Sequence, residues 1–307
     1  YNNQQVNLYY TMKSDNTLST WRTTAYIQDT WKWRTNGGSY TLTGGVRSHY
    51  WTFNNEWLVS PRASISLVPY WKKDFSFRFA TGLYYQAPFY KEIRDTLNDA
   101  LGNVRIRLNE NIQSQRSVQF VFGGDHYFRA FGRPFKFTTE AYLKLADRVS
   151  IYDIENVQIT YSGENNAKAY TAGVDFKLFG ELVPGTDSWI NFSLMNSKED
   201  IIGDSYIKNT YDDKRNIISS EVVSPGWVSR PNEQRYAFSM MFQDYLPKNP
   251  DYKVQLKFVY SDGLPFGPPR NNLHRAAFRS PAYKRVDLGG SRVLVRGSNK
   301  MLNKDWL

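Results

Sequence analysis

The sequence predicts an all-β protein, a transmembrane antiparallel up-and-down β-barrel, and three observations carry this prediction. Long segments alternate apolar and polar residues with the period of two that a strand requires. The connections between these segments alternate between short and long, and aromatic residues gather beside the short ones. Together these features are typical of a wall of strands that meets hydrocarbon on one face and water on the other.

The composition narrows the class of protein. The chain has 307 residues, of which 41% are hydrophobic and 16% aromatic, and Lys+Arg exceed Asp+Glu by 39 to 29. The basic residues are spread along the whole chain, which argues against nucleic acid as a partner. Cysteine is absent, so disulfides, zinc–thiolate sites and thiol nucleophiles are excluded. Neither a signal peptide nor an apolar run of about 18 residues, the length of a membrane-spanning helix, is found.

The clearest strand lies at the start of residues 74–93, DFSFRFATGLYYQAPFYKEI. Phe75, Phe77 and Phe79 take alternate positions, and Arg78 lies between them on the opposite face. The run exceeds the usual strand length of about 5–6 residues but suits a strand of about 9–11 residues tilted in a bilayer. A soluble sandwich would have to bury the arginine in its core, which is costly. We therefore expect the phenylalanines to face lipid and the arginine to face a wet lumen.

About twelve segments of this kind follow one another. They start near positions 3, 20, 39, 57, 74, 113, 134, 165, 188, 234, 251 and 283. The residues expected to face outward are Phe75, Phe77, Phe79, Leu83, Phe137, Leu143, Leu256 and Phe258, and those expected to face the lumen are Arg78, Glu140, Lys144 and Lys257. Asp29 and the Gly289–Gly290 step interrupt the alternation, and we expect bulges or interface positions there.

The connections predict which end of the wall is which. Short ones rich in Gly, Pro, Asn and Asp lie at 35–38, 71–74, 129–133, 184–187 and 247–251, whereas long polar ones lie near 88–112, 154–166, 201–233 and 262–282. In outer-membrane barrels the short turns are periplasmic and the long loops extracellular. Ten rings flank the short turns, and we expect them to form an aromatic girdle: Trp31, Trp33, Tyr70, Trp71, Phe128, Phe135, Phe179, Trp189, Tyr245 and Tyr252.

Several pieces of the chain, taken in order, carry a family resemblance. They are AYIQDTWKW (25–33), YTLTGGVRSHYW (40–51), SPRASISLVP (60–69), FSFRFATGLYYQAPFYKEI (75–93), GENNAKAYTAGVDFKLFGELVPG (163–185), RPNEQRYAFSMMFQDYLPKNP (230–250), SDGLPFGPP (261–269) and AYKRVDLGGSRVL (282–294). In this order and spacing the chain resembles the barrel of a TonB-dependent outer-membrane receptor of the type common in Bacteroidota. The resemblance covers nearly the whole chain.

The resemblance implies a barrel of 22 strands, plugged by an N-terminal globular domain and energised by TonB through a short N-terminal box. Nothing in residues 1–307 matches the plug, the box or the final strands, so we expect the chain to be part of a single barrel domain of a longer receptor, with about 12 of its strands. The implied partners are the TonB energy-transducing complex, outer-membrane lipid and lipopolysaccharide, and a surface lipoprotein is a further candidate. No cofactor or metal is implied.

The function that follows is active import of a nutrient, with loops and inner wall contacting the ligand. The candidate contact residues are Arg47, His49, Arg78, Tyr84, Tyr85, Tyr90, Arg94, Trp227, Arg230, Arg270 and Arg275. The plainer interpretation is that these are solvated loop residues or bind lipopolysaccharide phosphates. The nutrient itself stays open among siderophore, haem, glycan, peptide and cobalamin.

Two other classes of function are considered. A self-contained passive channel of about twelve strands is allowed by the even strand number. An enzyme is disfavoured because His49, His126 and His274 suggest no triad or metal cluster. The loop acids could bind calcium, but their spacing matches no known pattern, and solvation is the simpler explanation: Glu199, Asp200, Asp204, Asp212 and Asp213.

Overall fold

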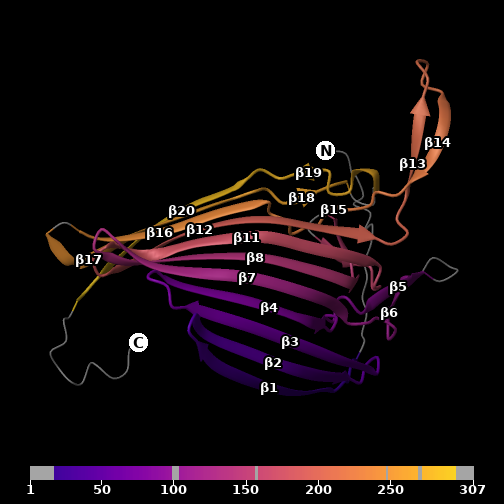
Figure 1. Cartoon of the computed structure of the whole chain (residues 1–307). Coiled ribbons are helices and arrows are strands. Elements are labelled where there is room, and N and C mark those ends of the chain that lie inside the picture. The colour runs from indigo at the N-terminus through magenta and orange to yellow at the C-terminus, as the bar shows by residue number, and fades with distance from the viewer. Residues whose placement is uncertain (1–16, 99–103, 156–157, 247, 269–271, 295–307) are drawn as a thin grey trace.

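The computed structural model of the chain describes residues 17–98, 104–155, 158–246, 248–268 and 272–294. A 12-stranded antiparallel sheet dominates it, in the order β1-β2-β3-β4-β7-β8-β11-β12-β16-β17-β20, with short β15 paired to β12. The sheet is a curved wall (Figure 1). Among the described residues no helix is long and apolar enough to cross a membrane.

The long strands lie where the alternation predicts them. They are β1 (Arg22–Thr35), β2 (Gly38–Trp51), β3 (Glu56–Pro69), β4 (Asp74–Gln86), β7 (Gln115–Ala130), β8 (Arg133–Val149), β11 (Ala167–Val183), β12 (Thr186–Ile201), β16 (Tyr236–Leu246), β17 (Asn249–Ser261) and β20 (Tyr283–Arg292). Each begins within about two residues of its predicted start. The segment predicted near position 3 lies outside the described residues. The predicted up-and-down order is confirmed.

The strand register separates two faces across the whole sheet. One ladder row is apolar: Trp31, Leu42, Ile65, Phe79, Phe122, Ala141, Val174, Leu194 and Tyr236. The next row is mostly polar: Lys32, Thr41, Ser66, Arg78, Gly123, Glu140, Asp175, Ser193, Ala237 and Ser261. Phe79 is 39% exposed and Phe122 56%, so these rings do not fill a core. The predicted division into a phenylalanine face and a charged face is confirmed, and we call them the apolar face and the polar face.

The connections between strands differ at the two ends of the sheet (Figure 1). At one end the strands join through turns of a few residues, with positive φ at Phe131, Gly132 and Gly185. At the other end the longer connections fold into hairpins of their own: β5 (Arg94–Asn98) with β6 (Val104–Leu108), β9 (Tyr152–Glu155) with β10 (Gln158–Tyr161), β13 (Tyr206–Tyr211) with β14 (Ile217–Val223), and β18 (Pro265–Phe266) with β19 (Phe278–Arg279). The last connection also holds η1 (Asn272–His274), and β15 is Val228–Ser229. These are the long polar connections that the sequence predicts, and the short strands within them were not predicted.

The strand register shows no bulge at either of the positions where the alternation is interrupted. The β1–β2 register runs unbroken through Asp29, which pairs with Gly44, and the β17–β20 register runs unbroken through Gly289. Asp29 instead accepts a 2.7 Å hydrogen bond from the backbone N–H of Thr30. A Cβ on Gly289 would lie 2.9 Å from the Gln255 side chain, so this glycine makes room for its cross-strand neighbour. The main-sheet register shifts lie elsewhere, at 167–169, 180–183 and 245–246.

The expected aromatic girdle is partly wrong. On the apolar face a stack of rings runs beside the tight turns, from Phe75 to His126 (4.2 Å), then Phe128 (5.3 Å) and Phe135 (5.7 Å). Trp71 packs edge-on against Phe75 at 5.9 Å. Three of the ten rings, however, have the strand positions of the polar face: Phe179, Trp189 and Tyr245. Proximity to a turn does not decide the face of a ring, because successive side chains alternate.

The buried clusters sit under the hairpins. Trp51, Ile93 and Ile112, each 1% exposed, pack together where β2 meets the connection from β4 to β7. A second cluster joins Val149, Ala167, Ala169 and Ile201 at the same end. Within the described residues β1 pairs only with β2 and β20 only with β17. A self-contained barrel would require the segment at residues 3–12 to pair with β20, and residues 3–12 lie outside the described part.

Candidate ligand-facing wall and hairpin rim

A cluster of paired charges occupies the middle of the polar face. Asp125 on β7 is 7% exposed and accepts hydrogen bonds from Arg78 Nη1 at 2.8 Å and Thr138 Oγ1 at 2.7 Å. Lys136 Nζ lies 3.4 Å from Asp125, and Arg78 Nη2 lies 3.3 Å from Glu140. This part of the wall is therefore polar but electrically balanced.

Gly123 leaves room for the Arg78 side chain in this cluster. It pairs with Arg78 in the ladder, and a Cβ at this position would lie 2.9 Å from Arg78 Nε. A side chain here would displace the guanidinium from its two carboxylates. Arg78 thus reaches across Gly123 on β7 to Glu140 on β8, and three strands are joined by one side chain.

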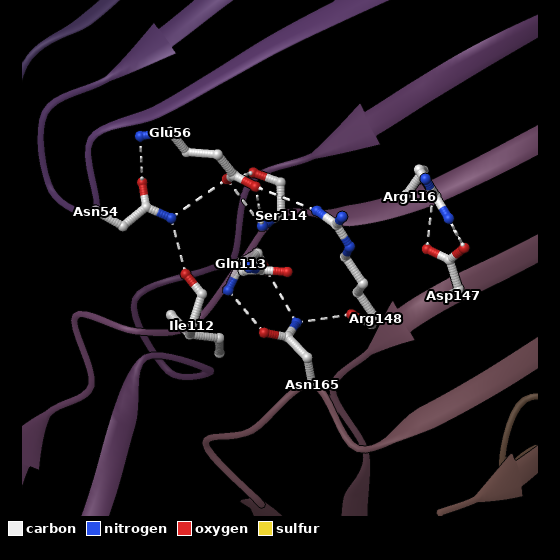
Figure 2. A network of polar contacts seen from close by, with 9 residues as sticks. All are labelled: Asn54, Glu56, Ile112, Gln113, Ser114, Arg116, Asp147, Arg148 and Asn165. Carbon is white, nitrogen blue, oxygen red and sulfur yellow. Dashed lines mark hydrogen bonds and ion pairs between the residues drawn. The ribbon is translucent and has the colours of Figure 1, made fainter.

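A second network ties together the hairpin-bearing ends of the strands (Figure 2). Glu56 at the start of β3 accepts hydrogen bonds from Ser114, from the backbone N–H at 2.9 Å and from Oγ at 2.5 Å, and lies 3.7 Å from Arg148 Nη1. Asn54 donates to the Ile112 carbonyl at 2.8 Å. Side chains of the β2–β3 turn therefore hold the end of the connection that leads into β7.

Asn165 extends this network toward β11. Its Nδ2 donates to the carbonyls of Gln113 at 2.9 Å and Arg148 at 2.7 Å, and its Oδ1 accepts from the Gln113 N–H at 2.6 Å (Figure 2). One asparagine thus joins the connection before β7, the end of β8 and the connection before β11. These three bonds tie together the points at which the connections leave the wall.

We call the hairpin-bearing end of the sheet the rim. A third cluster of charged side chains holds the connections at the rim between β12 and β20. Glu199, 3% exposed, accepts from Arg230 Nε at 3.2 Å and from Arg275 Nη2 at 3.1 Å. Glu233, 2% exposed, accepts from the Ser197 N–H at 3.0 Å and is ion-paired with Arg279.

Asp262 completes this cluster. It pairs with Arg235 at 2.6 Å and with Arg279 at 3.1 Å. The hydrogen bond from Arg235 lowers the pKa of the Asp262 carboxyl below its ordinary value. Arginines from the connections therefore converge on acids at the strand ends, and each acid serves as an anchor for a loop.

The predicted ligand-contact residues fall into several groups. On the polar face lie Arg47, His49, Arg78 and Tyr84, whereas Tyr85 follows Tyr84 in β4 and lies on the apolar face. In the connections, Arg94 lies over the ring of Tyr90 at 5.6 Å, Trp227 packs edge-on against Tyr170 at 5.1 Å, and Arg230 and Arg275 share Glu199. Arg270 lies outside the described residues.

Sequence reasoning missed the acids that organise these groups. Asp125, Glu233 and Asp262 were not singled out, and Glu199 was expected to be solvated but is buried between two arginines. Their signal in the sequence was weak, because the basic partners lie between 11 and 76 residues away along the chain. Asp212 accepts hydrogen bonds from the N–H groups of Lys214 at 2.9 Å and Asn216 at 2.7 Å and thereby shapes the β13–β14 turn. In the described part of the chain, no three His, Asp or Glu side chains are placed to hold a metal ion.

Comparisons with known proteins found a matching family model and a similar solved structure. The family model described as "TonB dependent receptor-like, beta-barrel" matches residues 1–295. Among solved structures, one titled "Structure of the RagAB peptide importer in the 'closed-closed' state" is similar, with a TM-score of 0.45 and 12% sequence identity over 73% of this chain. The chain covers 32% of that structure's chain. No curated protein matches the sequence.

Proposed function

The chain belongs to the TonB-dependent receptor-like β-barrel family of the bacterial outer membrane, and on this basis we propose that it forms part of the wall and outer loops of a nutrient importer. The observation that carries the proposal is the two-faced sheet, whose apolar rings are exposed on one side while paired charges line the other. Lipid covers the apolar face, and the polar face borders a watery lumen.

In this proposal the chain belongs to a single barrel domain, and further polypeptide of the receptor supplies the remaining strands and the plug. The tight turns face the periplasm and the hairpins face the outside, as in barrels of this class. The TonB complex supplies the energy, and lipopolysaccharide surrounds the hairpin end of the apolar face. The protein contributes a pathway and a binding surface, and the proposal requires no bond to be made or broken in the ligand.

In this proposal some rim residues hold the loops in place and others contact the ligand. Arg230 and Arg275 are bound to buried Glu199 and serve to hold the loops. Tyr90 and Trp227, 45% and 46% exposed, are better placed to meet a ligand. The β13–β14 hairpin projects beyond the rim (Figure 1), and Ile207 and Val222 on it are 66% and 72% exposed. We propose this hairpin as the contact for a surface lipoprotein.

The test is energised uptake by the full receptor. A strain that lacks the receptor gene is grown on a panel of glycans, peptides, haem, cobalamin and iron chelates, and growth on one of them is expected to fail. A plasmid copy should restore growth only while the TonB complex is intact. Uptake that continues undiminished without TonB would identify a passive channel instead.

A further inference from the structure

A hollow of about 680 Å³ lies on the polar face of β1–β4, away from the paired charges of β7 and β8. Its lining includes Thr24, Thr43, Arg47, Ser60, Arg62 and Tyr84. The volume falls within the range of about 300–1,000 Å³ that small-molecule sites occupy. Four of these six side chains carry hydroxyl groups and the other two are arginines, so the hollow offers hydrogen-bond donors beside apolar neighbours such as Ile27 and Val46.

Arg62 is held in a stacked position at the centre of the hollow. Its guanidinium carbon lies 4.4 Å from the centre of the Tyr84 ring. In the ladder Arg62 has Gly45 on one side and Gly82 on the other. A Cβ on Gly82 would lie 3.0 Å from Arg62 Cγ and 3.1 Å from the Tyr84 ring, so glycine provides the space for the stack. Stacking uses the faces of the guanidinium and leaves its N–H donors directed sideways.

Arg47 lies diagonally across the ladder from Arg62. Arg47 pairs with Ser60, and Gly45 pairs with Arg62, so the two arginines share the polar face on neighbouring strands. Diagonal side chains of an antiparallel pair start about 7–8 Å apart, within reach of long side chains. Ser60, 6% exposed, lies between them. Arg47, Ser60 and Arg62 therefore occupy neighbouring positions on the polar face.

The positive charges of Arg47 and Arg62 are not balanced by acidic side chains in the described part of the wall. Neither Arg47 nor Arg62 has a carboxylate within 4.0 Å among the described residues, and the residues that line the hollow include no Asp or Glu. On the next strand Arg78 has two carboxylate partners. Two positive charges in a concave site attract an anion more strongly than scattered surface charges do, because the walls focus the field.

We propose that this hollow binds an oxyanion group, a carboxylate or a phosphate, of a ligand that passes along the wall. Arg62 and Arg47 hold the oxygens, Ser60 and Thr43 donate further hydrogen bonds, and the Tyr84 ring supports the stacked arginine. The source of the ligand rests on the proposed import function, whereas anion binding itself does not. An acidic segment of the receptor that fills the lumen is the competing occupant, and the experiment separates the two.

The test uses the full receptor in detergent solution with two probes, inorganic phosphate and succinate. Binding is followed by line broadening of the phosphate signal in phosphorus NMR and by saturation transfer to succinate. Arg47→Gln and Arg62→Gln are each expected to weaken binding by about tenfold, as loss of a charged hydrogen bond predicts. Lys32→Gln removes the same charge from the polar face of β1 outside the hollow and is expected to leave binding unchanged. Gel mobility with and without boiling confirms that each variant is folded.

Three outcomes would overturn the anion site. They are no binding of either probe to the wild type, equal binding by Arg47→Gln, Arg62→Gln and Lys32→Gln, or binding that appears only after the lumen-filling domain is deleted. The last result would assign the hollow to that domain. Uptake by the same variants keeps the two proposals distinguishable. TonB-dependent uptake without probe binding removes only the anion site, and probe binding with TonB-independent uptake removes only the import function.

Discussion

Arg62 on β3 and Arg78 on β4 lie on neighbouring strands of the same polar face, yet their surroundings differ. Arg78 is ion-paired with Asp125 at 2.8 Å and Glu140 at 3.3 Å, so carboxylates of the wall balance its charge. Arg62 lies on the Tyr84 ring and, among the described residues, has no carboxylate within 4.0 Å. Both arginines have a glycine directly opposite, Gly123 for Arg78 and Gly45 for Arg62. The difference arises at the diagonal positions, where β7 supplies Asp125 to Arg78 while β2 supplies Thr43 and Arg47 to Arg62.

The contrast separates two uses of the same residue in a barrel wall. An arginine that is paired on both sides contributes to the rigidity of the wall and leaves little charge for a ligand. An arginine whose neighbours are glycines and hydroxyl groups keeps its N–H donors available for a ligand. Composition cannot distinguish the two uses, since both arginines follow the same alternation. The following substitutions test whether the distinction holds.

The largest effect is expected when an arginine is placed on the other face. Phe79→Arg puts a guanidinium on the apolar face at the middle of β4, and arginine near the bilayer midplane costs about 2–4 kcal/mol. Ala80→Arg, one residue away at the same depth, adds the same group to the polar face, and we expect a loss well below that. Folding titrations of the full receptor in lipid vesicles measure both. Equal losses would mean that the faces are misassigned.

The next effect is expected at the balanced cluster. Asp125→Asn keeps the shape of the side chain but removes the charge that faces Arg78 and Lys136. Loss of a hydrogen bond between charged groups costs about 1–3 kcal/mol, and the 39% exposure of the Arg78 side chain places the loss near the lower end. Glu140→Gln is the matched control, because its side chain is 36% exposed and its pair with Arg78 is longer. It should cost about 0.2–1 kcal/mol. A larger loss for Glu140→Gln would show that Asp125 does not organise the cluster.

A smaller effect is expected at two acids of the rim, Glu92 and Asp262. Their contributions to local stability should depend on pH in opposite directions. Burial raises the pKa of Glu92, which is 5% exposed, whereas the hydrogen bond from Arg235 lowers the pKa of Asp262. A raised carboxyl pKa means that the folded state holds its proton more tightly, so local stability falls as pH rises from the unfolded to the folded pKa. A lowered pKa has the opposite sign, and the stability is lost as pH falls through the folded pKa.

Hydrogen exchange measures this difference between the two loops. The backbone N–H of Ile93, beside Glu92, should exchange faster as pH rises through the window above the ordinary glutamate pKa, after correction for intrinsic exchange. The N–H of Gly263, which donates to Asp262 at 3.0 Å, should lose protection as pH falls below the ordinary aspartate pKa. Glu92→Gln and Asp262→Asn should each remove only their own dependence. The same sign at both positions would contradict the assignment.

Much of the fold could be predicted from the sequence because one rule governs it. A period of two assigns each residue of a strand to a face, and the length of the alternation sets where strands such as 74–86 begin and end. The face of Phe77 and of Arg78 followed directly. The same rule would have placed Phe179 on the polar face by counting from Lys177, had the counting been preferred to proximity to a turn.

The parts of the site that could not be predicted depend on pairing between distant segments. Arg78 meets Asp125 from 47 residues away, and the choice of partner requires the exact register of β4 against β7. The strands inside the long connections have at most seven residues, so even the alternating run VRIRL at Val104–Leu108 gives little signal. The role of Gly82 depends on the Arg62 and Tyr84 side chains that it accommodates, which one sequence does not display.

The smallest effect on stability is expected at Arg62, and it is the most decisive for the contrast between the two arginines. Arg62→Gln removes a charge without breaking an ion pair among the described residues, so the free energy of unfolding should change by no more than about 0.5 kcal/mol. Arg78→Gln should cost more, because it leaves Asp125, 7% exposed, with one cation fewer. Denaturant titrations in lipid vesicles compare the two variants under the same conditions. If Arg62→Gln destabilises the barrel as much as Arg78→Gln, then Arg62 is a structural residue of the wall, and the distinction between a balanced region and a ligand-facing region is lost.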